Sequence, residues 1–294
     1  MLKKTILSIT VVLISGCGGG GTTGNSQLAE NTTISGNDTT GKRDAILSGV
    51  RLKSSVRYSH GGKNKYSEIY EYDKNKVIKS TNTLRVNNTI VSSGINTHTY
   101  ENNQLKISIW KLYDANKKLT NTITTTSSYD TQRRPYKIVL ETTEGEKRVI
   151  ETTKWQGRYP LQQKDELYIN NKLHSTYTCI ARIDEDRVAS MKLVTTNTAN
   201  KVERSVSETY TYDNQDRKDP IAYLLSGDTE KYGENSIMHV YFLLTNTEQK
   251  DNLNNTTSNF KRSHEFNALG LVVKKTEEWV EDDNYHTIYE YEEY

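Results

Sequence analysis

Apolar and polar residues alternate along most of the chain from Gly49 onward. The runs that show this alternation most clearly are 50–58, 105–113, 136–140 and 201–212. In the first run, Leu52, Val56 and Tyr58 share one parity, whereas Ser55 and Arg57 take the other. A period of two residues predicts β-strands with one buried face and one wet face. Outside the first twenty residues, no comparable run of helical period interrupts the pattern.

Clusters of Asn and Asp interrupt these runs about every 12–16 residues, which is typical of hairpin loops. The intervals leave about 9–11 residues for each strand, so the chain holds roughly 15–18 strands. Strands joined so regularly by short loops predict an all-β protein, a long up-and-down antiparallel meander of hairpins. A sheet of this size is expected to be strongly twisted or curled into an open, barrel-like form.

Composition agrees with half-buried strands. Only 33 % of the residues are hydrophobic, and Tyr (20 residues) far exceeds Phe and Trp (three each). Tyrosine favours pleated surfaces with one solvated face. The net charge of +2 excludes the strongly basic balance typical of nucleic-acid binding, so no nucleic-acid partner is expected.

The N-terminus resembles a lipoprotein signal. Lys3 and Lys4 precede a short apolar run over 6–14, too short to span a bilayer. Ile14-Ser15-Gly16-Cys17 then resembles the lipobox of bacterial lipoproteins, which implies that Cys17 is diacylated and becomes the mature N-terminus. An ordinary secretory signal peptide with a chance cysteine is the alternative.

The domain organisation follows from this reading. Residues 1–16 are expected to form a lipoprotein signal peptide, and residues 17–45 a lipidated Cys followed by a flexible tether rich in Gly, Thr and Asn. Residues 46–294 are expected to form a single β-hairpin-repeat domain. Two acyl chains hold a protein stably at a membrane, so a lipid-anchored envelope protein, expected at the outer membrane, is predicted.

A Tyr-Asp motif recurs where predicted strands end. The clearest copy is Tyr70-Glu71-Tyr72-Asp73-Lys74-Asn75-Lys76, and weaker copies surround Asp114, Asp130, Asp213 and Asn267. The motif resembles YD/RHS repeats, and more closely bacterial envelope lipoproteins of unknown function that are built from such hairpins. In physical terms, the Tyr packs on the sheet, the Asp caps the turn, and Asn75 or Asn116 takes the left-handed position.

Catalytic chemistry is not indicated. The six histidines lie more than five residues apart, and the sequence has no P-loop, Gly-x-Ser-x-Gly or Cys-x-x-Cys motif. Cys179 lies in a strand-like run and is predicted to be a buried, inert thiol. We therefore predict no enzyme activity, no catalytic residue, no metal site and no cofactor.

Tyrosine is the enrichment with functional potential. The pairs that share a face are Tyr70 and Tyr72, Tyr210 and Tyr212, and Tyr289 and Tyr291. Their rings either form the core of a chain poor in Phe, or line a concave surface that binds ligand. These six residues are the weak candidates for ligand binding.

The sequence predicts a non-enzymatic binding or structural module that acts through its β surface. A glycan, a lipid or a protein would be its partner, in addition to the membrane that holds its anchor. The alternative is a carrier of lipid or another hydrophobic ligand on the concave face of the curled sheet. An outer-membrane barrel is disfavoured, because charged and hydroxylated residues alternate through 201–211. The sequence leaves open whether the sheet closes around a cavity.

Overall fold

The computed structural model describes residues 50–74, 76–156, 159–184, 187–213, 244–278 and 285–293. Within these ranges lie a short 3₁₀ turn, η1 (His60–Gly62), and sixteen strands: β1 (Val50–Ser59), β2 (Asn64–Asp73), β3 (Lys76–Val86), β4 (Thr89–Glu101), β5 (Gln104–Asp114), β6 (Leu119–Tyr129), β7 (Pro135–Thr142), β8 (Glu146–Gln156), β9 (Tyr159–Ile169), β10 (Lys172–Asp184), β11 (Arg187–Asn197), β12 (Val202–Tyr212), β13 (Leu244–Asp251), β14 (Thr256–Phe266), β15 (Val272–Glu278) and β16 (Tyr285–Glu293).

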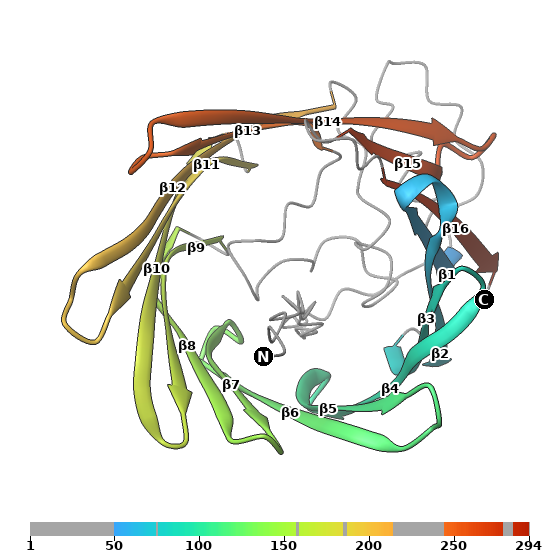
Figure 1. Cartoon of the computed structure of the whole chain (residues 1–294), viewed down its shortest axis with the longest axis horizontal. Helices are drawn as coiled ribbons and strands as arrows, with labels where there is room; N and C mark the ends of the chain where they lie inside the picture. Colours follow the sequence, from blue (N-terminus) through green and yellow to red (C-terminus); the bar gives the residue numbers. More distant parts are fainter. Residues whose placement is uncertain are drawn as a thin grey trace, which may run out of the picture.

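The strands form one closed, up-and-down antiparallel barrel. Each strand pairs with its neighbours in sequence, and β16 pairs with β1 to close the ring (Figure 1). The predicted all-β meander and its strand number are confirmed. The question that the sequence left open is answered as well, since the sheet closes. A barrel of this strand number is wider than its inward side chains can fill.

Burial distinguishes the two faces of the wall. In β6, Ile123, Thr125 and Ser127 are buried, whereas Thr124 and Thr126 are half-buried. Side chains on the concave side of a closed sheet shield one another, so the buried parity is the inner wall. The register then assigns the remaining strands, because directly paired residues lie on the same face.

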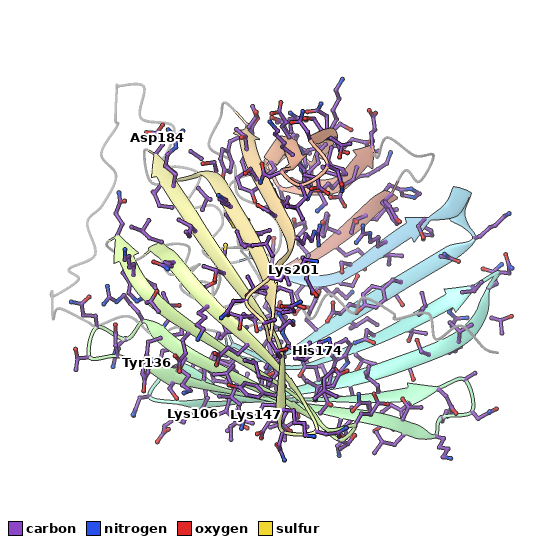
Figure 2. The ribbon with its side chains drawn as sticks, turned by 60° about the vertical axis from the view of Figure 1, so that its left-hand side comes forward. Lys106, Tyr136, Lys147, His174, Asp184 and Lys201 are labelled. Atoms are coloured by element: carbon purple, nitrogen blue, oxygen red, sulfur yellow. The ribbon has the colours of Figure 1, made fainter. Side chains whose placement is uncertain are left out.

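The outer wall carries ion pairs around much of the ring. Five pairs of Lys and Glu have Nζ–O distances of 2.6–2.8 Å: Lys79–Glu71, Lys137–Glu151, Lys147–Glu141, Lys164–Glu166 and Lys274–Glu265. Figure 2 shows Lys147 along the outer edge of the wall. Some exposed isoleucines have polar neighbours, as Ile180 pairs with Gln162 and Lys192, whereas Ile288 pairs with Val56. The outer wall is therefore predominantly polar and charged.

β-bulges change the parity of several strands near the rim where β1 begins. In β1 the extra residue is Lys53, because Leu52 pairs with Tyr291 and Ser54 with Glu290. One extra residue likewise follows a buried residue near the start of five other strands: Val77, Leu105, Pro135, Val188 and Val272. An extra residue reverses the alternation beyond it. The prediction that Val56 and Tyr58 share the face of Leu52 is therefore wrong: Ser55 and Arg57 face the lumen instead.

The core consists of apolar clusters spaced around the inner wall. One contains Leu52, Tyr70, Val77, Val272 and Tyr289, where the barrel closes. Two others lie farther round the ring: Ile123, Ile138 and Leu140 on β6 and β7, and Cys179, Ala181, Val188 and Met191 on β10 and β11. A wide barrel is thus stabilised by local clusters on its wall.

Hairpin loops explain the recurring Asp and Asn. Asp114 Oδ1 accepts hydrogen bonds from the backbone N–H groups of Asn116 and Lys118, both at 2.9 Å. Asp130, Asn197 and Asn267 accept equivalent pairs of bonds. The predicted capping role is confirmed for these residues. The left-handed residue follows three positions after the cap, so Lys117 (φ 63°) takes it and the prediction for Asn116 is wrong. Asn75 lies outside the described residues.

Candidate functional site

Five tyrosines share one arrangement at the rim where β1 begins and β16 ends, here called the tyrosine rim. Each hydroxyl donates to the backbone carbonyl of a buried residue near the start of the preceding strand. The bonds are Tyr72 to Leu52 (2.5 Å), Tyr100 to Val77 (2.8 Å), Tyr129 to Leu105 (2.7 Å), Tyr212 to Val188 (2.6 Å) and Tyr291 to Val272 (2.8 Å). Each bond satisfies the polar hydroxyl of a Tyr side chain whose ring is apolar. It also links the strand that carries the Tyr to the preceding strand.

The other three candidate tyrosines lie deeper on the inner wall. Tyr70 is buried and donates to Glu68 at 3.0 Å, and Tyr210 donates to Glu208. Burial raises the pKa of both Glu68 and Tyr70, although hydrogen bonds from Ser80 and Tyr70 lower the pKa of Glu68 in part. Tyr289 is buried in the apolar cluster at the barrel closure.

The predicted pairs do face one way, but they do not form one continuous row. The pairs on β2 and β16 flank β1 and meet in the closure cluster, whereas the pair on β12 packs beside the cluster of β10 and β11. The hydroxyl groups of Tyr72, Tyr212 and Tyr291 donate to backbone carbonyls, and those of Tyr70 and Tyr210 donate to Glu side chains. The partners of these five hydroxyls are therefore groups of the barrel wall itself. Ligand binding by these tyrosines stays a prediction.

A cationic group surrounds Glu277 on the inner wall. Arg262 Nε lies 3.1 Å from its carboxylate, Arg57 3.7 Å and Lys275 3.9 Å. Burial raises the pKa of Glu277, but Lys275, Arg57 and Arg262 together outweigh it and hold the pKa below its usual value. Three cations around one carboxylate leave a positive region in this part of the lumen.

A polar patch on the inner face of β3, β4 and β5 was not anticipated from the sequence. The β3–β5 patch consists of Asn82, Gly94, Asn96, His98, Ser108 and Trp110. Asn82 pairs with Gly94, Asn96 with Trp110, and His98 with Ser108, so the six residues form a contiguous grid across three strands. Ser108 Oγ donates to Asn96 Oδ1 at 2.7 Å.

Two side chains of this patch keep buried polar atoms without a protein partner. They are both ring nitrogens of His98 and the indole Nε1 of Trp110. Burial lowers the pKa of His98 to about 4, so the imidazole is neutral near neutral pH. The available sequence signal was Gly94, a glycine inside an alternating strand, which often marks a close approach. The spacing of the histidines gave no reason to single out His98.

The other residues with possible chemical roles are the two cysteines and the side chains that could bind metal. Cys179 is buried, as predicted, with its Sγ 3.5 Å from Met191 Sδ, and burial raises the pKa of its thiol to about 12. Among the described residues, no three His, Cys, Asp or Glu side chains gather as metal ligands. Cys17 lies outside the described ranges, so its lipidation stays a prediction. In the part of the chain that the structure describes, no helix has the length and apolar character needed to cross a bilayer.

The barrel has a porin-like fold. It is similar to the crystal structure of a porin-like protein from Bacteroides uniformis, with a TM-score of 0.50 and 9 % identity, over 82 % of this chain and 98 % of that chain. A porin-like protein from Bacteroides vulgatus aligns over the same shares at 12 % identity and a TM-score of 0.45. The sequence matches no family model and no curated protein.

These findings correct the proposed resemblance to envelope lipoproteins with YD/RHS repeats. The strands belong to one porin-like barrel of sixteen strands. The Tyr-Asp motif recurs because successive hairpins reach the same rim, where each needs an inward Tyr and a turn cap. Similar local demands therefore produced the similar motif.

Proposed function

We propose that this protein is a non-enzymatic binding barrel of the bacterial cell envelope, whose outer wall faces water and whose lumen receives a ligand. The porin-like fold supports the barrel and its envelope setting. The observation that carries the proposal is the ring of Lys–Glu pairs on the outer wall. Attachment through Cys17 would hold such a barrel at a membrane without inserting its wall.

The outer wall argues against burial in lipid. Barrels that cross membranes present a continuous apolar band to the hydrocarbon, and a Lys at the bilayer midplane costs about 2–4 kcal/mol. Here Lys79, Lys137 and Lys164 each pair with a Glu on the outer face. Hydroxylated residues fill much of the remaining outer surface of β6, including Thr124. Such a surface is stable in water and not in acyl chains.

The inner wall favours a polar ligand over a lipid. A carrier of acyl chains needs a largely apolar lining with few polar groups. The inner wall instead interrupts its apolar clusters with the β3–β5 patch and with the cations around Glu277. The lumen of a wide barrel with such a lining suits a hydrated solute.

The water-facing wall can be tested by placing a probe on it. In the full chain, Thr124→Cys would carry a polarity-sensitive thiol dye on the outer wall, and Thr195→Cys is the inner-wall control, because Thr195 is also half-buried but pairs with Tyr177 on the face of Cys179. The variants are incorporated into liposomes that contain brominated lipid. We expect iodide in the buffer to quench the dye at position 124, and brominated lipid to leave it unquenched.

The opposite result at position 124 would refute the proposal. Quenching by brominated lipid together with protection from iodide means that the outer wall contacts acyl chains. Both variants also carry Cys17→Ser, so labelling is specific to the introduced cysteine, because the buried Cys179 has a raised thiol pKa.

A further inference from the structure

Two neighbouring rows of paired residues cross the inner wall where the barrel closes, from β14 to β1 (Figure 1). Directly paired residues lie on the same face, as do residues two apart along a strand, so both rows face the lumen together with Arg57. Both rows carry cations, and together they are called the cationic patch. The rows are Arg57, Thr287 and Lys275, and Tyr285, Glu277 and Arg262.

The three cations of the patch approach one carboxylate, but they are not held equally. Arg262 is bound on two sides, because its Nε lies 3.1 Å from Glu277 Oε1 and its Nη1 donates to Thr247 Oγ1 at 2.8 Å. Arg57 Nη2 and Lys275 Nζ approach the other oxygen, Glu277 Oε2, at 3.7 and 3.9 Å. These two separations exceed the length of a hydrogen bond, so both contacts with Glu277 are ion pairs without a hydrogen bond.

The patch has a local excess of positive charge. Three cations and one carboxylate leave two net positive charges, counted over the patch itself. The inner-wall carboxylates on either side have donors of their own. Glu68 on β2 accepts a hydrogen bond from Tyr70, and Glu208 on β12 accepts one from Tyr210. A wall with such an excess attracts anions into the lumen.

A solute can reach this charge through Arg57. The Arg57 side chain is 44 % exposed, whereas those of Lys275 and Glu277 are 15 % and 12 % exposed. Its guanidinium lies over the ring of Tyr285, 4.4 Å from the ring centroid, which orients the group. A guanidinium has five N–H donors in a rigid fork, more than the contact with Glu277 uses. A solute in the lumen can therefore bind Arg57 without displacing a side chain.

We infer that the cationic patch binds a compact dianion of the phosphate class, with Arg57 as the main contact and Lys275 as the second cation. Two net positive charges match a group with two negative charges, and the planar fork of arginine matches phosphate oxygens. Arg262 and Glu277 are positioning residues, because they hold the two cations at one place on the wall. This inference rests on the proposed binding function and deepens it by naming the site and the class of ligand.

An arginine across the ring provides a matched control (Figure 1). Arg148 on β8 also faces the lumen, since it pairs with the buried Leu140, and its side chain is 40 % exposed. It likewise lies over a tyrosine ring, that of Tyr177. Its charge is balanced, however, because it forms an ion pair with Asp165. The inference therefore predicts that Arg57 contributes to anion binding and that Arg148 does not.

Isothermal titration calorimetry on the purified full chain tests the site. The buffer has low ionic strength, because salt screens exposed charges, and is held at about pH 8, where phosphate groups carry about two charges. The probes are inorganic phosphate and glucose 6-phosphate. Dimethyl phosphate carries one charge, malonate carries two on separate carboxylates, and glucose carries none. The variants are Arg57→Gln, Arg57→Lys, Glu277→Gln and the control Arg148→Gln, and far-UV circular dichroism checks the fold of each.

We expect both phosphate probes to bind, dimethyl phosphate and malonate to bind more weakly, and glucose not to bind. Arg57→Gln should weaken phosphate binding by about tenfold, because a charge-assisted hydrogen bond is lost. Arg57→Lys keeps the charge but loses the fork, so its affinity should be intermediate. Glu277→Gln removes the negative charge of the patch and should strengthen binding. Arg148→Gln should leave the affinity unchanged. If Glu277→Gln does not fold, the exposed Arg57 variants decide.

Each of the following results would overturn the inference: neither phosphate probe binds, Arg57→Gln binds phosphate as the unaltered chain does, Arg148→Gln weakens binding as much as Arg57→Gln, a folded Glu277→Gln binds more weakly, or glucose, dimethyl phosphate or malonate binds more tightly than phosphate. Failure here is distinct from failure of the proposed function. A dye at position 124 exposed to water, without phosphate binding, refutes only the ligand assignment. A dye quenched by brominated lipid refutes the water-facing barrel itself.

Discussion

Acidification should destabilise the barrel through His98. Burial lowers the pKa of His98 to about 4, against 6.5 for the ordinary imidazole. Because the folded-state pKa is the lower one, the unfolded chain binds the proton first, and stability is lost as the pH falls from 6.5 toward about 4. Relative to neutral pH, the linkage amounts to about 2 kcal/mol at about pH 5 and about 3 kcal/mol at about pH 4.

Urea denaturation of the full chain, followed by circular dichroism at about pH 7, 5 and 4, measures this loss. In His98→Phe the ring remains but the titrating group is gone, so this variant should lose about 2 kcal/mol less than the unaltered chain between about pH 7 and 5. Glu68 acts in the opposite direction: its raised pKa gives stability that is present at low pH and is lost as the pH rises. Comparing the two proteins cancels that contribution.

His174→Phe is the matched control, since His174 is exposed at the surface (Figure 2). It should keep the pH dependence of the unaltered chain. Equal losses of stability in the unaltered chain and in His98→Phe would refute the reasoning, and so would an NMR titration that finds His98 protonating near its ordinary pKa.

Three further predictions concern the rim, the loops and the N-terminus. Tyr129→Phe removes the bond to the Leu105 carbonyl and should cost about 1 kcal/mol in thermal melts; an unchanged melt would mean that the rim bond adds nothing. Asp114→Ala should cost about 0.5–2 kcal/mol, because two backbone N–H groups lose their acceptor, whereas Lys117→Gly should be neutral or stabilising at a positive φ. The reverse order in melting temperature would contradict the loop geometry. Cys17→Ser should abolish labelling by a fatty-acid probe in bacteria, and labelling that persists would rule out acylation at this residue.

The hairpins could be predicted because their signals are local. Alternation over about ten residues and an Asn or Asp at each end suffice to define a strand and its turn. Capping by Asp114 and Asp130 followed from the residue type alone. Even the position of the left-handed residue depends on loop geometry, which is why Lys117 and not Asn116 adopts it.

The inner surface could not be predicted, because it depends on register between strands. One extra residue, Lys53, moves Arg57 from the outer wall to the lumen. Likewise, Trp110 and Asn82 meet over Gly94 only because β4 pairs with β3 and β5 at one particular offset. Such offsets are set by β-bulges and by packing around the whole barrel. The alternation of apolar and polar residues in the sequence does not reveal them.

The junction between β1 and β16 has a consequence for how the chain acquires its shape. Arg51 bonds Glu292 at 2.7 Å across a separation of 241 residues, whereas the paired strands elsewhere in the ring are neighbours along the chain. Hairpins can thus form while the chain is being synthesised. The barrel cannot close until β16 has left the ribosome and can pair with β1, and this pairing has the largest loop-closure entropy cost. Until then, two unpaired edges stay open to other nascent chains. Charged side chains such as Arg51 and Glu292 at those edges oppose intermolecular strand addition during the wait.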